Sequence, residues 1–232
     1  MSNSRYSQRL YIINHIAEYL TDLHEKINEQ FEVTILGKRF IVCPGVFSPI
    51  GTSSEFLSSN LLINHGDTVL DLGTGVGIQA VIAAEKAKKV VATDINKEAL
   101  VCAKMNVENN YLADKVEIRY GDLLEPIGDG EQFDVIIWSP PFLPLSPCRV
   151  LDKGWCCGNN DDLIMRFFAH VKNHLTSNGR IEIFYSTLGN MAYLLSKATS
   201  AGFNVSLVAT HIIPEHPEKL LVLLFQVENQ NN

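Results

Sequence analysis

The sequence predicts an α/β fold in which helices cover both faces of a mostly parallel sheet. From residue 69 onward, short apolar runs alternate with helix-forming runs, which is typical of a parallel sheet. The end of the chain differs, because residues 203–213 and 219–227 are two apolar runs with no helix between them and should pair antiparallel. We therefore expect seven strands, of which the last is antiparallel.

The part of the chain before residue 69 predicts a long helix and a small hairpin. Apolar residues recur at three- and four-residue intervals over residues 5–30, as on an amphipathic helix that packs against another surface. A Leu36-Gly37 turn between two short apolar runs predicts the hairpin. The hairpin strands, the following loop and the start of the next helix are expected at residues 32–35, 38–42, 44–52 and 53–57.

The main domain follows in order from its strand and helix patterns. Runs rich in valine and isoleucine predict strands, and the helix-forming runs between them predict the connecting helices. The expected strands before the final pair are residues 69–72, 89–94, 115–120, 133–138 and 180–186. The expected helices are residues 78–87, 97–109, 160–175 and 189–201.

Composition indicates one sizeable core. With 232 residues and 46% hydrophobic content, the chain should form one main domain, residues 44–232, with an extension of residues 1–43. No apolar run spans a bilayer and no apolar signal core follows the N-terminus, so we expect a cytoplasmic protein with no membrane partner. The oligomeric state stays open.

Charge and cysteine content exclude several function classes. The formal net charge is −7 and no basic run occurs, which argues against a large nucleic-acid footprint without excluding RNA. The five cysteines include no C-x-x-C pair, so neither a disulfide framework nor a zinc site is indicated. His170 and His174 are four residues apart, but no carboxylate or thiol joins them at ligand spacing, and we expect no metal.

A glycine-rich turn is the most informative feature of the chain. The strand of residues 69–72 carries Asp71 and leads into Gly73, Gly75 and Gly77 at every second position. Glycine leaves room for a ligand against the main chain, and the amides at the start of the next helix point at the same spot. The spacing G-x-G-x-G differs from the G-x-G-x-x-G of dinucleotide sites. A nucleotide-like ligand is indicated, with a purely structural turn as the alternative.

Two more acids follow the next two strands. Asp94 ends the second strand about 20 residues after the first glycine, the spacing of a ribose-binding carboxylate in a βαβ unit. Its alternative role is helix capping, although Asn96 is itself a good cap. Asp122 follows the third strand, and its candidacy depends on the two acids before it.

A proline pair follows the fourth strand at the sheet edge where open α/β folds bind ligands. Pro140 and Pro141 bring no amide donors, so the carbonyls of Ser139 and Pro140 stay able to accept hydrogen bonds. Phe142 can stack on a flat group. The alternative is an ordinary proline-rich loop.

Residues 69–77 resemble motif I of the class I S-adenosyl-L-methionine (SAM) methyltransferases, which are built on a Rossmann-like seven-stranded sheet with an antiparallel last strand. The resemblance implies SAM as the cofactor, with the third acid on the adenine amino group. The implied cofactor-binding residues are Asp71, Gly73, Thr74, Gly75, Gly77, Asp94, Ile95, Asp122 and Leu123.

The proline segment resembles motif IV, N/D/S-P-P-Y/F, of methyltransferases that modify a planar nitrogen. This likeness implies that the catalytic residues are Ser139, Pro140, Pro141 and Phe142. Asparagine is the usual first residue when the acceptor is glutamine. Serine also occurs there in enzymes that act on the cytosine N4 amine, so the acceptor stays open.

Two flanking segments resemble different branches of the small methyltransferase domain superfamily. Residues 155–161 look like the segment that follows motif IV in release-factor glutamine methyltransferases. Residues 44–48 look like the entry loop of ribosomal RNA guanine-N2 methyltransferases. The acidic chain without an appended RNA-binding domain favours a protein glutamine, on a release-factor-like partner. The alternatives are guanine or another nucleobase of ribosomal RNA, then a small-molecule amine. A catalytically idle partner subunit of the same fold is a different class.

Overall fold

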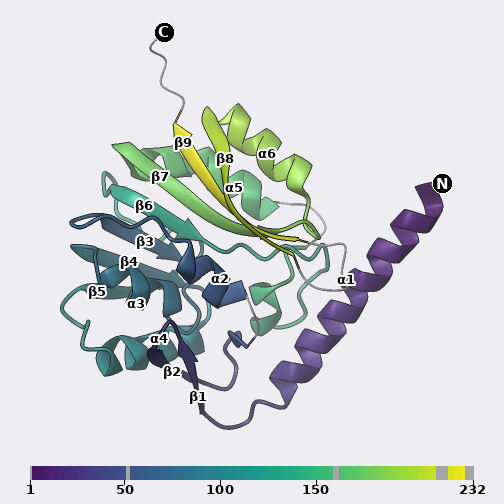
Figure 1. Cartoon of the computed structure of the whole chain (residues 1–232), viewed down its shortest axis with the longest axis horizontal. Coiled ribbons are helices and arrows are strands. Elements are labelled where there is room, and N and C mark those ends of the chain that lie inside the picture. The colour runs from purple at the N-terminus through teal and green to yellow at the C-terminus, as the bar shows by residue number, and fades with distance from the viewer. Residues whose placement is uncertain (1, 51–52, 159–161, 213–218, 228–232) are drawn as a thin grey trace.

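The computed structural model describes residues 2–50, 53–158, 162–212 and 219–227, and centres on a seven-stranded sheet with strand order β5-β4-β3-β6-β7-β9-β8 (Figure 1). Strands β3 to β7 run parallel, whereas β9 is antiparallel to both β7 and β8. The predicted sheet and its antiparallel last strand are confirmed. The strands are β3 (Thr68–Leu72), β4 (Lys89–Asp94), β5 (Val116–Tyr120), β6 (Phe133–Trp138), β7 (Leu175–Ser186), β8 (Phe203–Ile212) and β9 (Lys219–Val227).

Helices cover both faces of this sheet, because successive residues of a strand point to opposite sides. In β3, Val69 packs with α3, α4 and the hairpin, and Leu70 packs with α5 and α6. The helices are α1 (Ser2–Glu25), α2 (Ser53–Ser59), α3 (Ile78–Ala84), α4 (Lys97–Asn109), α5 (Asp162–His170) and α6 (Met191–Ser200), with 3-10 turns η1 (Leu151–Gly154) and η2 (Val171–His174). Among the described residues, none of the helices is both long and apolar enough to cross a membrane.

The N-terminal extension has two parts that pack differently. The hairpin strands β1 (Phe31–Ile35) and β2 (Lys38–Val42) pair antiparallel, and Phe40 and Val42 are fully buried in the same apolar cluster as α3 and α4. Helix α1 lies beside the sheet, and its N-terminal end projects away from the rest of the molecule (Figure 1). Arg9, in the first half of α1, nevertheless donates to the carbonyls of Leu188 and Gly189, so α1 contacts the main domain along much of its length.

Three predicted helices end three or more residues earlier than expected. The predicted helix over residues 78–87 ends at Ala84, with Glu85 as its C-cap. The predicted helix over residues 5–30 ends at Glu25, since the chain must turn there to reach β1. The predicted helix over residues 160–175 ends at His170, because Leu175 already pairs with Phe133 at the start of a longer β7. The predictions for residues 51–52, 159–161 and 213–218 lie outside the described residues.

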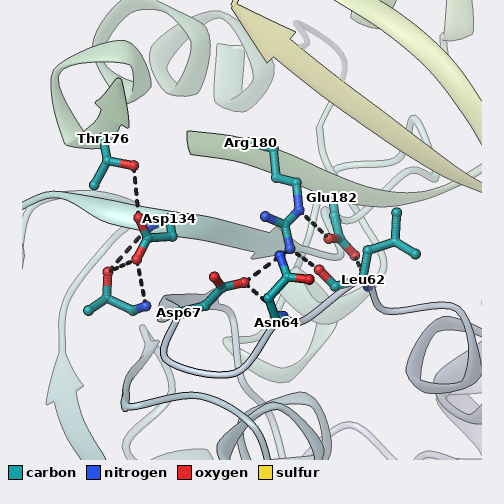
Figure 2. A network of polar contacts seen from close by, with 8 residues as sticks. Leu62, Asn64, Asp67, Asp134, Thr176, Arg180 and Glu182 are labelled. Carbon is teal, nitrogen blue, oxygen red and sulfur yellow. Dashed lines mark hydrogen bonds and ion pairs between the residues drawn. The ribbon is translucent and has the colours of Figure 1, made fainter. Parts of the chain in front are cut away.

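A buried polar network ties the loop before β3 to the middle of β7 (Figure 2). Arg180 contacts Glu182 at 3.2 Å and Asp67 at 3.1 Å, and it also donates to the Leu62 carbonyl. The Leu62 amide donates to Glu182 at 3.0 Å. Burial raises the pKa of Glu182, and the Leu62 amide and Arg180 oppose that shift. Arg180 is thus the counter-charge that makes a fully buried carboxylate tolerable.

Replacing Arg180 with methionine should lower the free energy of unfolding by about 3 kcal/mol, because removing one partner leaves a buried charge uncompensated. The control is Lys104→Met, which breaks an exposed pair with Glu108 at 4.0 Å. That change should cost no more than about 0.5 kcal/mol. Urea denaturation measures both, and equal effects of the two variants would contradict a special role of Arg180.

Candidate active site

A cavity of about 530 Å³ opens at the carboxyl ends of β3, β4 and β6. It is lined by residues from all four segments that the sequence singled out, so residues 50 or more positions apart meet in one place. Its lining includes Gly73, Thr74, Gly75, Asp94, Ile95, Asp122, Leu123, Ser139, Pro140, Pro141 and Phe142. Of the predicted site residues, all of which the structure describes, Asp71 and Gly77 are missing from the lining.

The three glycines of the turn have two different roles. Gly73 and Gly75 have φ angles of 71° and 56°, and a Cβ atom on either would meet nothing within 4 Å. Gly77 caps α3 at φ 88°, and a Cβ there would lie 3.1 Å from the Cα of Ala103 in α4. The first two leave space on the cavity side for a ligand, whereas Gly77 allows two helices to approach closely.

Asp94 holds the glycine turn and faces the cavity. Its two carboxylate oxygens accept hydrogen bonds from the amides of Gly75 at 2.9 Å and Asn96 at 2.8 Å. Burial raises the pKa of Asp94, and these amides oppose the rise. Each oxygen has a second lone pair, so the carboxylate can still accept from two vicinal hydroxyls of a ribose. The geometry fits the predicted ribose contact.

Asp71 lies behind the turn. Its carboxylate is buried and accepts a hydrogen bond of 2.6 Å from the Thr74 hydroxyl. Burial, with the nearby Asp94 charge as a smaller contribution, raises the pKa of Asp71 to about 7, and the Thr74 bond only partly offsets this. Asp71 thus shapes the turn through Thr74.

This raised pKa predicts a pH-dependent stability difference for Asp71→Asn. A carboxyl whose folded pKa exceeds its unfolded value contributes stability that is fully present below the unfolded pKa and is lost as the pH rises through the folded one. The amide of Asp71→Asn can accept from Thr74 but cannot ionise. The thermal midpoint of the variant minus that of the wild type should therefore grow from about pH 4 to about pH 7 and then level off. A difference that is constant with pH would contradict the assignment.

Asp122 has a partner that the sequence analysis missed. Arg166, on α5, contacts its Oδ2 at 2.7 Å, and both residues line the cavity. The pair lies 44 positions apart, and no local pattern marks an arginine in the middle of a helix as a site residue. Arg166 fixes the orientation of this carboxylate, for which the resemblance to motif I implies a contact with the adenine amino group.

The proline segment leads into a loop that closes one side of the cavity. The Phe142 ring packs edge-on against Tyr185, with ring centroids 6.2 Å apart. The Leu143 amide donates to the Trp155 carbonyl at 2.9 Å, and the Cys157 amide donates back to the Leu143 carbonyl at 2.9 Å. Phe142 is therefore held by the sheet on one side and by residues 143–157 on the other.

Four apolar side chains around Phe142 form what we call the acceptor wall. They come from three parts of the chain: Ile16 and Leu20 from α1, Phe47 from the loop of residues 44–50, and Trp155 from the segment of residues 143–157. All pack in one cluster with Phe142. The sequence identified these segments separately, through helical periodicity and two short resemblances. The apolar stripe of the predicted helix and its position just before residues 44–48 predict that it covers the acceptor side of the site or a partner surface, and Ile16 and Leu20 do line the cavity beside Phe142.

Two features of the cavity fit SAM. The space beside Gly73 and Gly75 would be filled by any side chain, and Asp94 presents a carboxylate that already accepts two amides and can accept two hydroxyls. The same cavity continues to the proline segment. A cofactor and a flat acceptor group therefore have adjacent places in it.

Comparison with known proteins gives the family. A model of the methyltransferase small domain matches residues 37–205. A Methanocaldococcus jannaschii protein, named as a candidate protein N5-glutamine methyltransferase, is 30% identical over 197 residues, 82% of this chain and 96% of that protein. The release factor glutamine methyltransferase of Koribacter versatilis is 38% identical over 167 residues, 65% of this chain and 59% of the relative. The chain thus spans nearly all of the first relative and little more than half of the second.

Solved structures show the same fold at lower sequence identity. The T. thermophilus 16S rRNA N2-guanine methyltransferase, solved with AdoMet and guanosine, aligns with a TM-score of 0.63 and 21% identity over 86% of this chain and 50% of that one. A ribosomal protein L11 methylase from Lactobacillus delbrueckii aligns with a TM-score of 0.60 and 18% identity over 81% of this chain and 84% of that one. The chain belongs to the methyltransferase small domain family and is a SAM-dependent methyltransferase, as its motifs predicted.

Proposed function

We propose that the protein methylates the side-chain amide nitrogen of a glutamine in a protein substrate. The observation that carries the proposal is the position of residues 139–142 in the same cavity as the glycine turn and Asp94. The names of the two relatives above, which refer to glutamine methyltransferases, support the same acceptor.

The cofactor end of the cavity has a simple task. Asp94 would accept the ribose hydroxyls, Asp122 would face the adenine amino group, and the backbone beside Gly73 and Gly75 would lie along the ligand. When bound, SAM supplies an electrophilic methyl group on a sulfonium. The protein residues hold this group at a fixed place relative to the acceptor.

The acceptor end must orient a poor nucleophile. The lone pair of an amide nitrogen is delocalised, so hydrogen-bond acceptors on its two N–H groups must aim it at the methyl group. The Ser139 hydroxyl and the carbonyls of Ser139 and Pro140 are the acceptors available in this segment, and the Phe142 ring offers a flat surface for the amide. Positioning of this kind can lower the activation free energy by several kcal/mol.

The surroundings favour a peptide over a nucleic acid. The acceptor wall is apolar, and of the two described cations that line the cavity, Lys153 and Arg166, Arg166 is already paired with Asp122. The whole chain carries a formal net charge of −7, whereas phosphate contacts require lysine and arginine in excess. An uncharged segment of a protein chain matches this wall better than an RNA backbone does.

The distribution of transferred label tests the proposal. Purified protein is incubated with methyl-labelled SAM in three separate reactions. These contain translation release factors, ribosomal proteins or ribosomal RNA from the source organism. We expect label in one protein fraction. Label confined to RNA would favour the nucleobase alternative, and SAM binding without transfer to any fraction would favour a non-catalytic role.

A further inference from the structure

We propose that His24, in the last turn of α1, is a positioning residue that holds the acceptor wall in place through the loop of residues 44–50. The identity of the acceptor rests on the function proposed above, whereas the effect on the loop does not. His24 is missing from the described lining of the cavity, so its action on an acceptor is indirect. It acts through three neighbours, one hydrogen-bonded and two stacked.

Both ring nitrogens of His24 are engaged, and the bonding partners fix its protonation. The side chain is buried, at 4% exposure. The Ser48 amide donates to Nε2 at 2.8 Å, and Nδ1 lies 2.6 Å from the Leu20 carbonyl oxygen. A backbone amide can only donate, so Nε2 must be unprotonated and Nδ1 must carry the hydrogen. The geometry therefore requires the neutral imidazole.

The same ring contacts two aromatic members of the acceptor wall. Its centroid lies 5.3 Å from that of Phe47 and 5.0 Å from that of Trp155, with interplanar angles of 25° and 26°. The ring centroids of Phe47 and Trp155 are 6.1 Å apart. The imidazole thus joins two cavity-lining rings from separate loops to the end of α1.

The loop of residues 44–50 has a second anchor on the cofactor side. The Asn96 side chain donates to the Gly45 carbonyl at 2.8 Å, and the Asn96 amide donates to Asp94. Phe47 lies between this anchor and the Ser48 bond to His24. One end of the loop is therefore fixed by the cofactor site and the other by α1, and His24 is the anchor that α1 supplies.

Protonation would release the anchor that His24 provides. An imidazolium has no lone pair at Nε2 to accept the Ser48 amide. Burial lowers the pKa of His24, Arg149 lowers it further, and Asp152 raises it. From α1 itself, Glu25 pairs with Arg149 at 3.2 Å, and residues 44–50 carry no titratable side chain. The anchor is complete above the ordinary histidine pKa of 6.5 and is lost as the pH falls through the lowered value.

Two substitutions separate the hydrogen bond from the stacking. In His24→Gln, the side-chain oxygen can accept the Ser48 amide without titrating, whereas His24→Phe keeps an aromatic ring but cannot accept. The matched control is His65→Gln, at an exposed histidine in the loop before β3. Three quantities are measured for each full-length variant: the amide hydrogen exchange rate at Ser48, the Kd for SAM, and kcat/KM for the protein that accepts the methyl group.

In His24→Phe, Ser48 should exchange about tenfold faster and kcat/KM for the acceptor should fall about tenfold, the equivalent of one lost buried hydrogen bond. The Kd for SAM should stay within about twofold, because Asn96 still holds the cofactor side. His24→Gln should keep Ser48 protected and should lose the acidic decline in kcat/KM that the wild type shows. His65→Gln should match the wild type in all three quantities.

Wild-type Ser48 protection together with wild-type kcat/KM in His24→Phe would overturn the inference. A parallel loss of SAM affinity in His24→Phe would also overturn it, since His24 would then support the whole fold. If the wild type methylates no protein fraction, the proposed function fails, and the exchange rate at Ser48 still decides the role of His24.

Discussion

Asp94→Ala is expected to weaken SAM binding at least about 100-fold while the chain stays folded. Two charge-assisted bonds to ribose hydroxyls, each worth roughly 1.5 to 3 kcal/mol, would be lost. The Gly75 and Asn96 amides would also lose their acceptor. Isothermal titration measures the affinity, and circular dichroism checks the fold. Asp114→Ala, at an exposed acid before β5, is the control and should bind as the wild type does. Unchanged affinity of Asp94→Ala would rule out the ribose contact.

Gly75→Val should reduce binding even more. Gly75 has a φ of 56°, which a β-branched residue adopts only at a cost, and its side chain would enter the open space beside the turn. Normal SAM affinity of Gly75→Val would show that the glycine turn is structural and that the ligand lies elsewhere.

The second large effect concerns turnover. Ser139→Ala and Phe142→Ala should each lower the rate of methyl transfer by ~10- to 1000-fold, about 1.4 to 4 kcal/mol, because in the proposed mechanism both residues orient the acceptor nitrogen in the transition state. SAM affinity should be unchanged, since neither residue belongs to the cofactor end. Single-turnover transfer of labelled methyl, together with titration of SAM, measures the two quantities separately.

Ser139→Asn distinguishes the acceptor classes. An asparagine side chain has a separate donor and acceptor, whereas serine has one hydroxyl on a shorter side chain. On a glutamine acceptor, Ser139→Asn should preserve or raise the rate. On an acceptor fitted to serine, the added bulk should lower it. Wild-type rates for both Ser139→Ala and Phe142→Ala would show that residues 139–142 are not the acceptor site.

The sheet and the cofactor end could be predicted because their signals are local. Asp94 and the glycine turn each follow a buried strand directly, and the carboxyl ends of parallel strands meet at one edge. One open α/β sheet therefore brings together residues that the sequence marks one strand at a time. The same argument placed Ser139 and Phe142 at this edge.

The acceptor wall could not be predicted because it depends on contacts between distant segments. Trp155 meets α1 only after the segment of residues 143–157 folds back on Leu143. His24 lies on an amphipathic helix whose partner the periodicity does not identify. Arg166 likewise finds Asp122 only in three dimensions. For Asp71, the resemblance to motif I implies a ligand contact. In the structure its carboxylate lies behind the turn and accepts a hydrogen bond from the Thr74 hydroxyl.

The measurement that tests the central claim most directly is tandem mass spectrometry of the acceptor after reaction with methyl-labelled SAM. The account predicts a single methyl group on the side-chain amide nitrogen of one glutamine, formed by the wild type and not by Asp94→Ala. A methyl group on a lysine, an arginine or a guanine of ribosomal RNA, again dependent on Asp94, would contradict it.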